Sequence, residues 1–156
     1  MFSNLDILFR RIGDAEYAYL LLEPLPLFGL LFGLIFLFFS KSRRLALIVI
    51  AVSCASATPY MKLRETATPR ILAMQEGQMT SRILAQNKLR KDVQWVYTSM
   101  TWAAVAAIFL GGRFGRLSNG ILIAGAVAAL LVSAWLHMKE AEVYHPNIIK
   151  QGPPKL

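Results

Sequence analysis

The sequence predicts an all-α, polytopic membrane protein with four transmembrane helices and an interfacial amphipathic helix at the N-terminus. Two observations carry this prediction: 56% of the 156 residues are hydrophobic, and the charged side chains are segregated from the apolar stretches. Helices of soluble domains carry a polar face, and disordered basic chains lack long apolar runs. The pattern therefore indicates a single membrane domain over residues 1–156. Glu23 is the only charged residue within the four apolar stretches, which are residues 17–39, 45–61, 93–112 and 117–138.

Residues 3–18 are expected to form the interfacial helix. Leu5 and Leu8 recur at helical spacing, and Arg10 and Arg11 flank this apolar stripe. A helix of this kind lies at the level of the lipid headgroups, with its basic side chains near anionic phosphates. The alternative is a helix that packs on a partner protein.

The first two apolar stretches are expected to span the membrane as a pair. Residues 17–39 are long enough to cross roughly 30 Å of hydrocarbon, and Pro24 and Pro26 either kink this helix or mark its first turn. Residues 45–61 are short for a span, so basic side chains at their ends are expected to snorkel.

Residues 62–92 form a basic loop or stem with seven basic and three acidic side chains. Thr68 and Pro69 predict a helix start, since proline suits the first helical position and threonine can cap it. The stem helix is then expected to run from Pro69 to Leu110, into the membrane, with a weak point at Gly77.

The basic side chains beside the membrane are expected to meet anionic lipid headgroups or an acidic partner surface. No aromatic-interleaved platform or known nucleic-acid-binding module accompanies them, so nucleic acid is not an expected partner. The residues assigned to this lipid or partner surface are Arg10, Arg11, Arg70, Arg82, Lys88, Arg90 and Lys91.

The last two apolar stretches have the features of a membrane interface at their ends. Trp95 and Trp102 stand near the entry of the third stretch, where amphipathic rings are expected. The fourth stretch is rich in alanine and finishes near Trp135. Residues 145–156 are punctuated by proline and predict an extended tail at the surface or on a partner.

The basic residues also predict an orientation. With four spans, the side that holds both termini and the long loop receives twelve of the 17 basic residues. The positive-inside rule places that side in the cytoplasm, with the protein in a bacterial inner membrane.

Small residues one turn apart predict close helix packing. Such residues let two helix backbones approach each other where no water drives association. Packing within the chain is the first interpretation, and a homodimer or a partner helix is the alternative. The pairs are Gly29 and Gly33, Ala103 and Ala107, and Ala124 and Ala128.

Glu23 is the only acidic residue in the four apolar stretches, and placing a carboxylate in lipid has a high cost in free energy. Its position beside Pro24 fits the membrane boundary, where it would be hydrated. The functional alternative is a proton-accepting or cation-binding group that faces the bundle.

The end of the fourth stretch carries the histidine and glutamate residues that could suggest a metal site. Spacings of three residues resemble half of a bundle di-metal site, but the other spans offer only Glu23 as a further inward carboxylate. A solvated helix end is therefore favoured, and no metal or cofactor is expected. The candidates weighed were His137, Glu140, Glu142 and His145.

The same reasoning weighs against enzymatic chemistry in this chain alone. Both histidines lie at one end of one helix, so a bis-histidine haem would need a ligand from a partner. Cys54 has no second cysteine for a disulfide within the chain. Phosphate-binding loops and nucleophile–histidine arrangements are not found in the sequence.

Two short motifs resemble a family of uncharacterised four-helix inner-membrane proteins of bacteria, a domain of unknown function. The run from Leu130 to Leu136, followed by Glu142-Val143-Tyr144, resembles the closing Leu-Val-Ser-Gly-Trp-Leu and Glu-Leu-Val-Tyr signature of that family. Pro24-Leu25-Pro26-Leu27 stands where the family has a His-Pro opening. The resemblance covers about residues 23–145 and implies the four-helix architecture. The family histidines are not kept, since Glu23 replaces the first, so no cofactor role is carried over.

These observations favour a non-catalytic accessory subunit of a larger membrane complex, first of all a bioenergetic one (electron transfer or photosynthetic). Other membrane protein subunits and anionic lipids are then the expected partners. One alternative is a small transporter or ion-conducting oligomer that uses Glu23. Another is a haem-binding redox protein that shares ligands with a partner.

Overall fold

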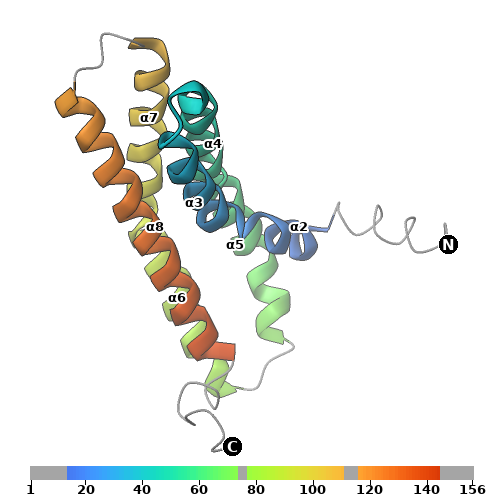
Figure 1. The fold of residues 1–156 in the computed structure, drawn as a ribbon. Coiled ribbons are helices and arrows are strands. Elements are labelled where there is room, and N and C mark those ends of the chain that lie inside the picture. The colour runs from blue at the N-terminus through green and yellow to red at the C-terminus, as the bar shows by residue number, and fades with distance from the viewer. Residues whose placement is uncertain (1–13, 74–76, 111–115, 145–156) are drawn as a thin grey trace, which may run out of the picture.

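The computed structural model describes residues 14–73, 77–110 and 116–144, and this part of the chain is helical without strands. Figure 1 shows the elements as rods joined by short turns. They are α2 (Ala15–Leu22), α3 (Leu25–Leu37), a 3₁₀ turn η1 (Ser40–Ser42), α4 (Arg43–Ala55), α5 (Ala57–Ala73), α6 (Gly77–Asp92), α7 (Gln94–Leu110) and α8 (Arg116–Tyr144).

Four helical segments of the described chain are long and apolar enough to cross a membrane. They are Ala18–Leu37, Arg43–Ala73, Met79–Leu110 and Asn119–Tyr144. The predicted all-α class with four candidate transmembrane helices is confirmed, and it is compatible with a multi-pass membrane protein. The predicted helix at residues 3–18 and the tail at residues 145–156 lie wholly or mostly outside the described residues.

Three of the four segments are interrupted along their length. The first turns at Glu23 and Pro24, the second breaks at Ser56, and the third breaks at Val93. Pro24 is the N-cap of α3 and Pro26 lies in its first turn, where a missing backbone N–H leaves no helical hydrogen bond unmade. The prolines thus both turn the chain and begin a helix.

The predicted stem helix differs from the observed one. Pro69 lies inside α5, so the predicted helix start at Thr68 and Pro69 is wrong. The Thr68 hydroxyl donates to the Arg64 carbonyl oxygen at 2.7 Å and does not cap a following helix. Pro69 is tolerated near the end of α5 because it is exposed, and water can reach the backbone carbonyl whose donor it lacks.

The fourth helix is longer than its apolar stretch. α8 continues past Met138 to Tyr144, because Leu136 and Val143 are both buried on its inner face. Glu140 lies on the same side of the helix, where it contacts two arginines described below.

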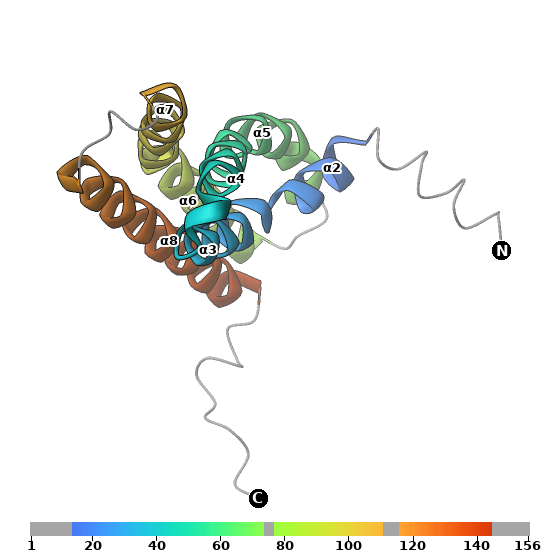
Figure 2. The same ribbon diagram turned by 45° about the horizontal axis from the view of Figure 1, so that its top comes forward.

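The apolar section is built from α3, α4, α7 and the first part of α8. α3 packs along α4, α4 packs along α7, and α8 crosses α3, whereas α7 and α8 contact each other less than these three pairs do (Figures 1 and 2). α5, α6 and the last turns of α8 continue beyond this section as a polar layer, with α2 beside α5 (Figure 2).

The glycines of α3 permit its close contact with α4. A Cβ atom on Gly29 would lie 1.7 Å from Ser53 Oγ, and one on Gly33 would lie 2.5 Å from Ile50 Cγ1. Any larger residue would push the two helices apart, so both glycines face α4 within this chain.

The predicted alanine pairs do not behave alike. Ala107 is buried and Ala103 is half-buried, whereas Ala124 and Ala128 are exposed on α8. Within the described chain, the interpretation of intrachain packing therefore fails for this last pair. The small residues that α8 does bury on its neighbours are Ala126, Ala129 and Ser133.

Candidate functional site: a buried charged network

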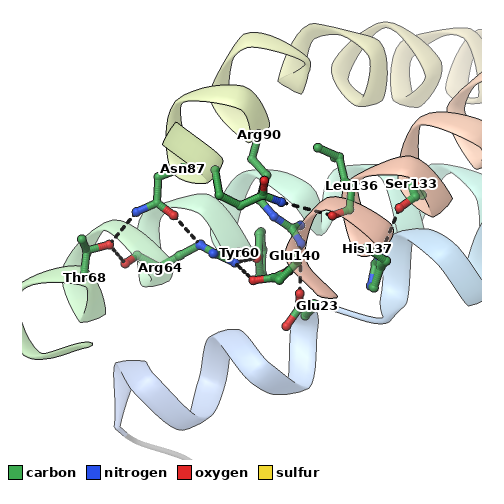
Figure 3. A network of polar contacts seen from close by, with 11 residues as sticks. Glu23, Tyr60, Arg64, Thr68, Asn87, Arg90, Ser133, Leu136, His137 and Glu140 are labelled. Atoms are coloured by element: carbon green, nitrogen blue, oxygen red, sulfur yellow. Dashed lines mark hydrogen bonds and ion pairs between the residues drawn. The ribbon is translucent and has the colours of Figure 1, made fainter. Parts of the chain in front are cut away.

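Four charged side chains meet where the apolar section joins the polar layer. Arg64 on α5 is 3% exposed and Arg90 on α6 is 6% exposed, which is rare for a guanidinium unless it is paired. Their partners are Glu23, at the corner between α2 and α3, and Glu140 on α8. We call these four residues the charged network (Figure 3).

Glu140 is the central anion of the charged network. Its Oε1 lies 2.6 Å from Arg64 Nη1, and its Oε2 accepts from Arg90 Nη2. The same Arg90 nitrogen lies 3.0 Å from Glu23 Oε1. Two guanidinium groups thus face two carboxyl groups, and these contacts join the α2–α3 corner, α5, α6 and α8 in one place.

Two tyrosine rings lie against the Arg64 guanidinium, and one of them, Tyr60, also lies against Arg90. Arg64 Nη1 donates to the Tyr60 hydroxyl at 2.5 Å, and the Arg90 guanidinium lies 5.1 Å from the Tyr60 ring centroid. Tyr19 on α2 lies 5.8 Å from Arg64 and meets Tyr60 edge-on, with 6.1 Å between centroids. Arginine suits such a site because its flat, weakly hydrated cation stacks on aromatic faces.

Amide side chains extend the charged network into the polar layer. Arg64 Nε donates to Asn87 Oδ1 at 2.6 Å, and Asn87 Nδ2 donates to Thr68 Oγ1 at 3.0 Å. Gln86 is also buried and donates to the Leu136 carbonyl oxygen at 3.1 Å. These bonds fix the register of α5, α6 and α8 against one another.

The charged network lies about one hydrocarbon thickness from the opposite end of the bundle. Roughly 20 residues separate Arg43 from Arg64, Arg90 from Leu110, and Asn119 from Glu140, which is about 30 Å of helix in each case. A bilayer core is about as thick. The distance from the charged network to the opposite end of the bundle therefore matches the thickness of a bilayer core.

A second set of hydrogen bonds links α7 to α8 on the apolar side of the charged network. The Ser133 hydroxyl donates to the Ala129 carbonyl oxygen at 2.9 Å, so it accepts from the Tyr97 hydroxyl at 2.8 Å. His137 Nδ1 lies 2.9 Å from the Ser133 carbonyl oxygen, which can only accept. His137 Nδ1 therefore carries a proton.

The structure shows Glu23 in an ion pair with Arg90. Its side chain is 18% exposed and contacts Arg90, so it faces the bundle as a member of the charged network. The metal candidates are also engaged: Glu140 binds two arginines, and Glu142 lies 2.8 Å from Lys139. No group of three metal-ligating side chains occurs among the described residues, and His145 lies outside them.

Only some residues of the predicted basic surface are exposed in the structure. Arg70, Arg82, Lys88 and Lys91 are exposed, and Lys91 lies 3.3 Å from Glu65. Arg90 is a correction, because it is buried and its charge is used inside the molecule. Arg10 and Arg11 lie outside the described residues.

Sequence reasoning missed Arg64 and the tyrosines around it. A helical signal was present, since Ala57, Tyr60, Arg64 and Ala67 recur at intervals of three and four residues and are all buried. Arg90 likewise follows buried Ile83 by seven residues. The phase of Arg64 with this buried stripe is the signal that distinguishes it from the solvated basic residues of the segment.

No protein-family model, curated protein or solved structure matches this chain.

Proposed function

We propose that the protein is a non-catalytic accessory subunit of a larger membrane complex, with bioenergetic complexes the first to examine. The observation that carries the proposal is an apolar groove of about 520 Å³ between α7 and α8. We name it the α7–α8 groove. It is lined by Trp95, Val96, Ser99, Met100, Ala103, Ile121, Leu122, Gly125, Ala128 and Val132.

The lining of the α7–α8 groove suits the backbone of another helix. Ser99, Ala103, Gly125 and Ala128 are small, and Ala128 is exposed in this chain. Helices in lipid associate through such residues, because the hydrophobic effect offers no gain from leaving one apolar environment for another. The occupant we infer is a transmembrane helix of a partner subunit.

The pairing of every carboxylate in the charged network with an arginine supports a structural role over ion conduction. Glu23 and Glu140 are both held by arginines that also stack on Tyr60. A transported cation would have to displace Arg90 from both carboxylates. The ion pairs instead fasten the polar layer to the apolar section and hold the α7–α8 groove in shape.

The proposal extends to location. In a bacterial inner membrane, the positive-inside rule places the termini, the polar layer and the charged network on the cytoplasmic side. The exposed basic residues of α6, Arg82, Lys88 and Lys91, then lie near anionic headgroups or an acidic face of the partner.

Site-specific photo-crosslinking in native membranes tests the partner helix. A crosslinking amino acid at Ala128 in the α7–α8 groove should form an adduct with one defined protein. The same amino acid at Ala106, which is exposed on α7 but outside the groove lining, should not.

Substitutions that fill the α7–α8 groove provide a second test of the partner helix. Ala103→Leu with Ala128→Leu should reduce co-purification of that protein about tenfold, since a lost helix contact is worth about 1 to 2 kcal/mol. Ala106→Leu should leave it unchanged. Adducts with lipid alone, or only with a second copy of this chain, would overturn the proposal.

A further inference from the structure

A pocket of about 150 Å³ lies at the end of the bundle away from the charged network, where the turn between α3 and α4 meets the first turns of α8 (Figure 1). Arg43 is the first residue of one candidate membrane span and Asn119 is the first residue of another, so the pocket lies at the end of both spans. About 10 to 15 Å³ suffices for one water molecule, so this pocket admits a larger group. We call it the Arg43 pocket, and its lining residues are Leu37, Arg43, Leu47, Asn119, Leu122 and Ile123.

The polar wall of the Arg43 pocket offers hydrogen-bond donors. Arg43 Nη2 donates to Asn119 Oδ1 at 2.5 Å. Because a guanidinium cannot accept, this bond fixes the orientation of the amide and leaves Asn119 Nδ2 as its second polar atom. Within the described residues, Asn119 Nδ2 and the other N–H groups of Arg43 form no further hydrogen bond. Donors of this kind suit an oxygen ligand with negative charge.

The charge around the Arg43 pocket has no counter-charge in the neighbouring chain. Arg43 is half-buried and forms no ion pair within the described residues. Lys41 and Arg44 beside it are exposed. Residues 24–64 and 93–139, which include α3, α4, α7 and the first part of α8, contain no aspartate or glutamate. This end of the bundle therefore favours an anion from outside the chain.

The rest of the pocket wall is apolar. Leu47 and Leu122 are buried, whereas Ile123 is 43% exposed. Phe38, at the end of α3, is 87% exposed. An anion that carries apolar chains can place its charge on Arg43 and its chains along these exposed side chains. Phospholipids are built in this way, and the fork of N–H groups on arginine matches the oxygens of a phosphate.

We propose that the Arg43 pocket binds the phosphate group of a membrane phospholipid, with the acyl chains along the exposed apolar side chains of α3 and α8. Arg43 supplies the positive charge, and Asn119 Nδ2 supplies a second donor. The lipid provides the counter-charge at this end of the bundle, as Glu23 and Glu140 do for the arginines at the other end. This binding site does not depend on a partner subunit.

Native mass spectrometry of the purified full chain in mild detergent tests the site, with phosphatidylglycerol as the probe. Arg43→Gln should raise the dissociation constant about tenfold, because it removes charge-assisted hydrogen bonds to the phosphate. Arg44→Gln removes the same charge from an exposed side chain outside the pocket lining, so it should change the constant less than about twofold. Equal effects of the two substitutions would overturn the proposal.

Asn119→Asp separates loss of the lipid from loss of the fold. The carboxylate has the shape of the amide and gives Arg43 a counter-charge within the chain, so the lipid-free protein should melt no lower than wild type. The same carboxylate repels phosphate, so the affinity for phosphatidylglycerol should fall at least about tenfold. Retained affinity in this variant would contradict the proposal.

Two further probes show which part of the lipid is recognised. Diacylglycerol carries the same acyl chains without phosphate, and inorganic phosphate carries no chains. Both should bind wild type at least about tenfold more weakly than phosphatidylglycerol does. Diacylglycerol binding of equal strength would overturn the role of Arg43, and equal binding of inorganic phosphate would overturn the assignment to a lipid.

Discussion

The contacts between α3 and α4 and between α7 and α8 both contain small residues, but the first contact is tightly packed and the second leaves a groove. Ser53 and Ile50 occupy the space beside Gly29 and Gly33, so no room is left for another helix at that contact. Gly125 and Ala128 line a groove that is open along α8 between Ile121 and Val132. Small residues therefore indicate that another helix backbone can pack closely at that position. They do not indicate whether that helix belongs to this chain or to another molecule.

The charged network explains how α8 can lie apart from α7 at one end. Glu140 clamps the other end of α8 to α5 and α6. Glu140→Ala is expected to destabilise the protein most, by about 3 to 5 kcal/mol, because Arg64 and Arg90 lose a shared anion while buried. Thermal unfolding in detergent measures the loss.

Glu142→Ala is the matched control on the same helix. Glu142 pairs with Lys139, and both side chains are 41% exposed, so the change should cost less than about 1 kcal/mol. Equal effects of the two substitutions would mean that the charged network does not clamp α8.

A smaller effect is expected where α3 meets α4. Gly29→Ala places a methyl group against Ser53 and should cost about 1 to 3 kcal/mol through overpacking. Ser53→Gly in the same chain removes the obstructing atoms, so the double variant should recover much of the melting temperature. Without this recovery, the closed contact would not depend on the fit of these two residues.

The smallest effect is expected at a glycine with open surroundings. No atom within 4 Å would meet a Cβ on Gly120, which lies inside α8. Gly120→Ala should stabilise the protein by about 0.5 to 1 kcal/mol, since alanine favours the helix and restricts the unfolded chain. Opposite signs for Gly29→Ala and Gly120→Ala would sharpen the distinction between closed and open surfaces, and equal signs would remove it.

The membrane-spanning segments could be predicted because their signal is local. An apolar run such as residues 17–39 shows its character without knowledge of any neighbour. The breaks were harder, since Ser56 and Val93 carry no strong turn signal and Pro69 suggested a helix start that does not exist.

The charged network could not be predicted for a different reason. Arg64 and Glu140 are 76 residues apart, and Arg90 and Glu140 are 50 residues apart. A basic residue in a polar segment is usually solvated, so local sequence favoured a surface position for Arg90. Only the packing of α5, α6 and α8 brings the opposite charges together and removes water from them.

The separation in sequence has a consequence for biogenesis. Arg64 and Arg90 are synthesised long before Glu140, so during synthesis the half-made chain holds two positive groups without their main counter-charge. The fourth segment must emerge and insert before the ion pairs can form. The charged network can therefore form only after α8 has been made, and any chain that stops before Glu140 leaves Arg64 and Arg90 without their shared carboxylate.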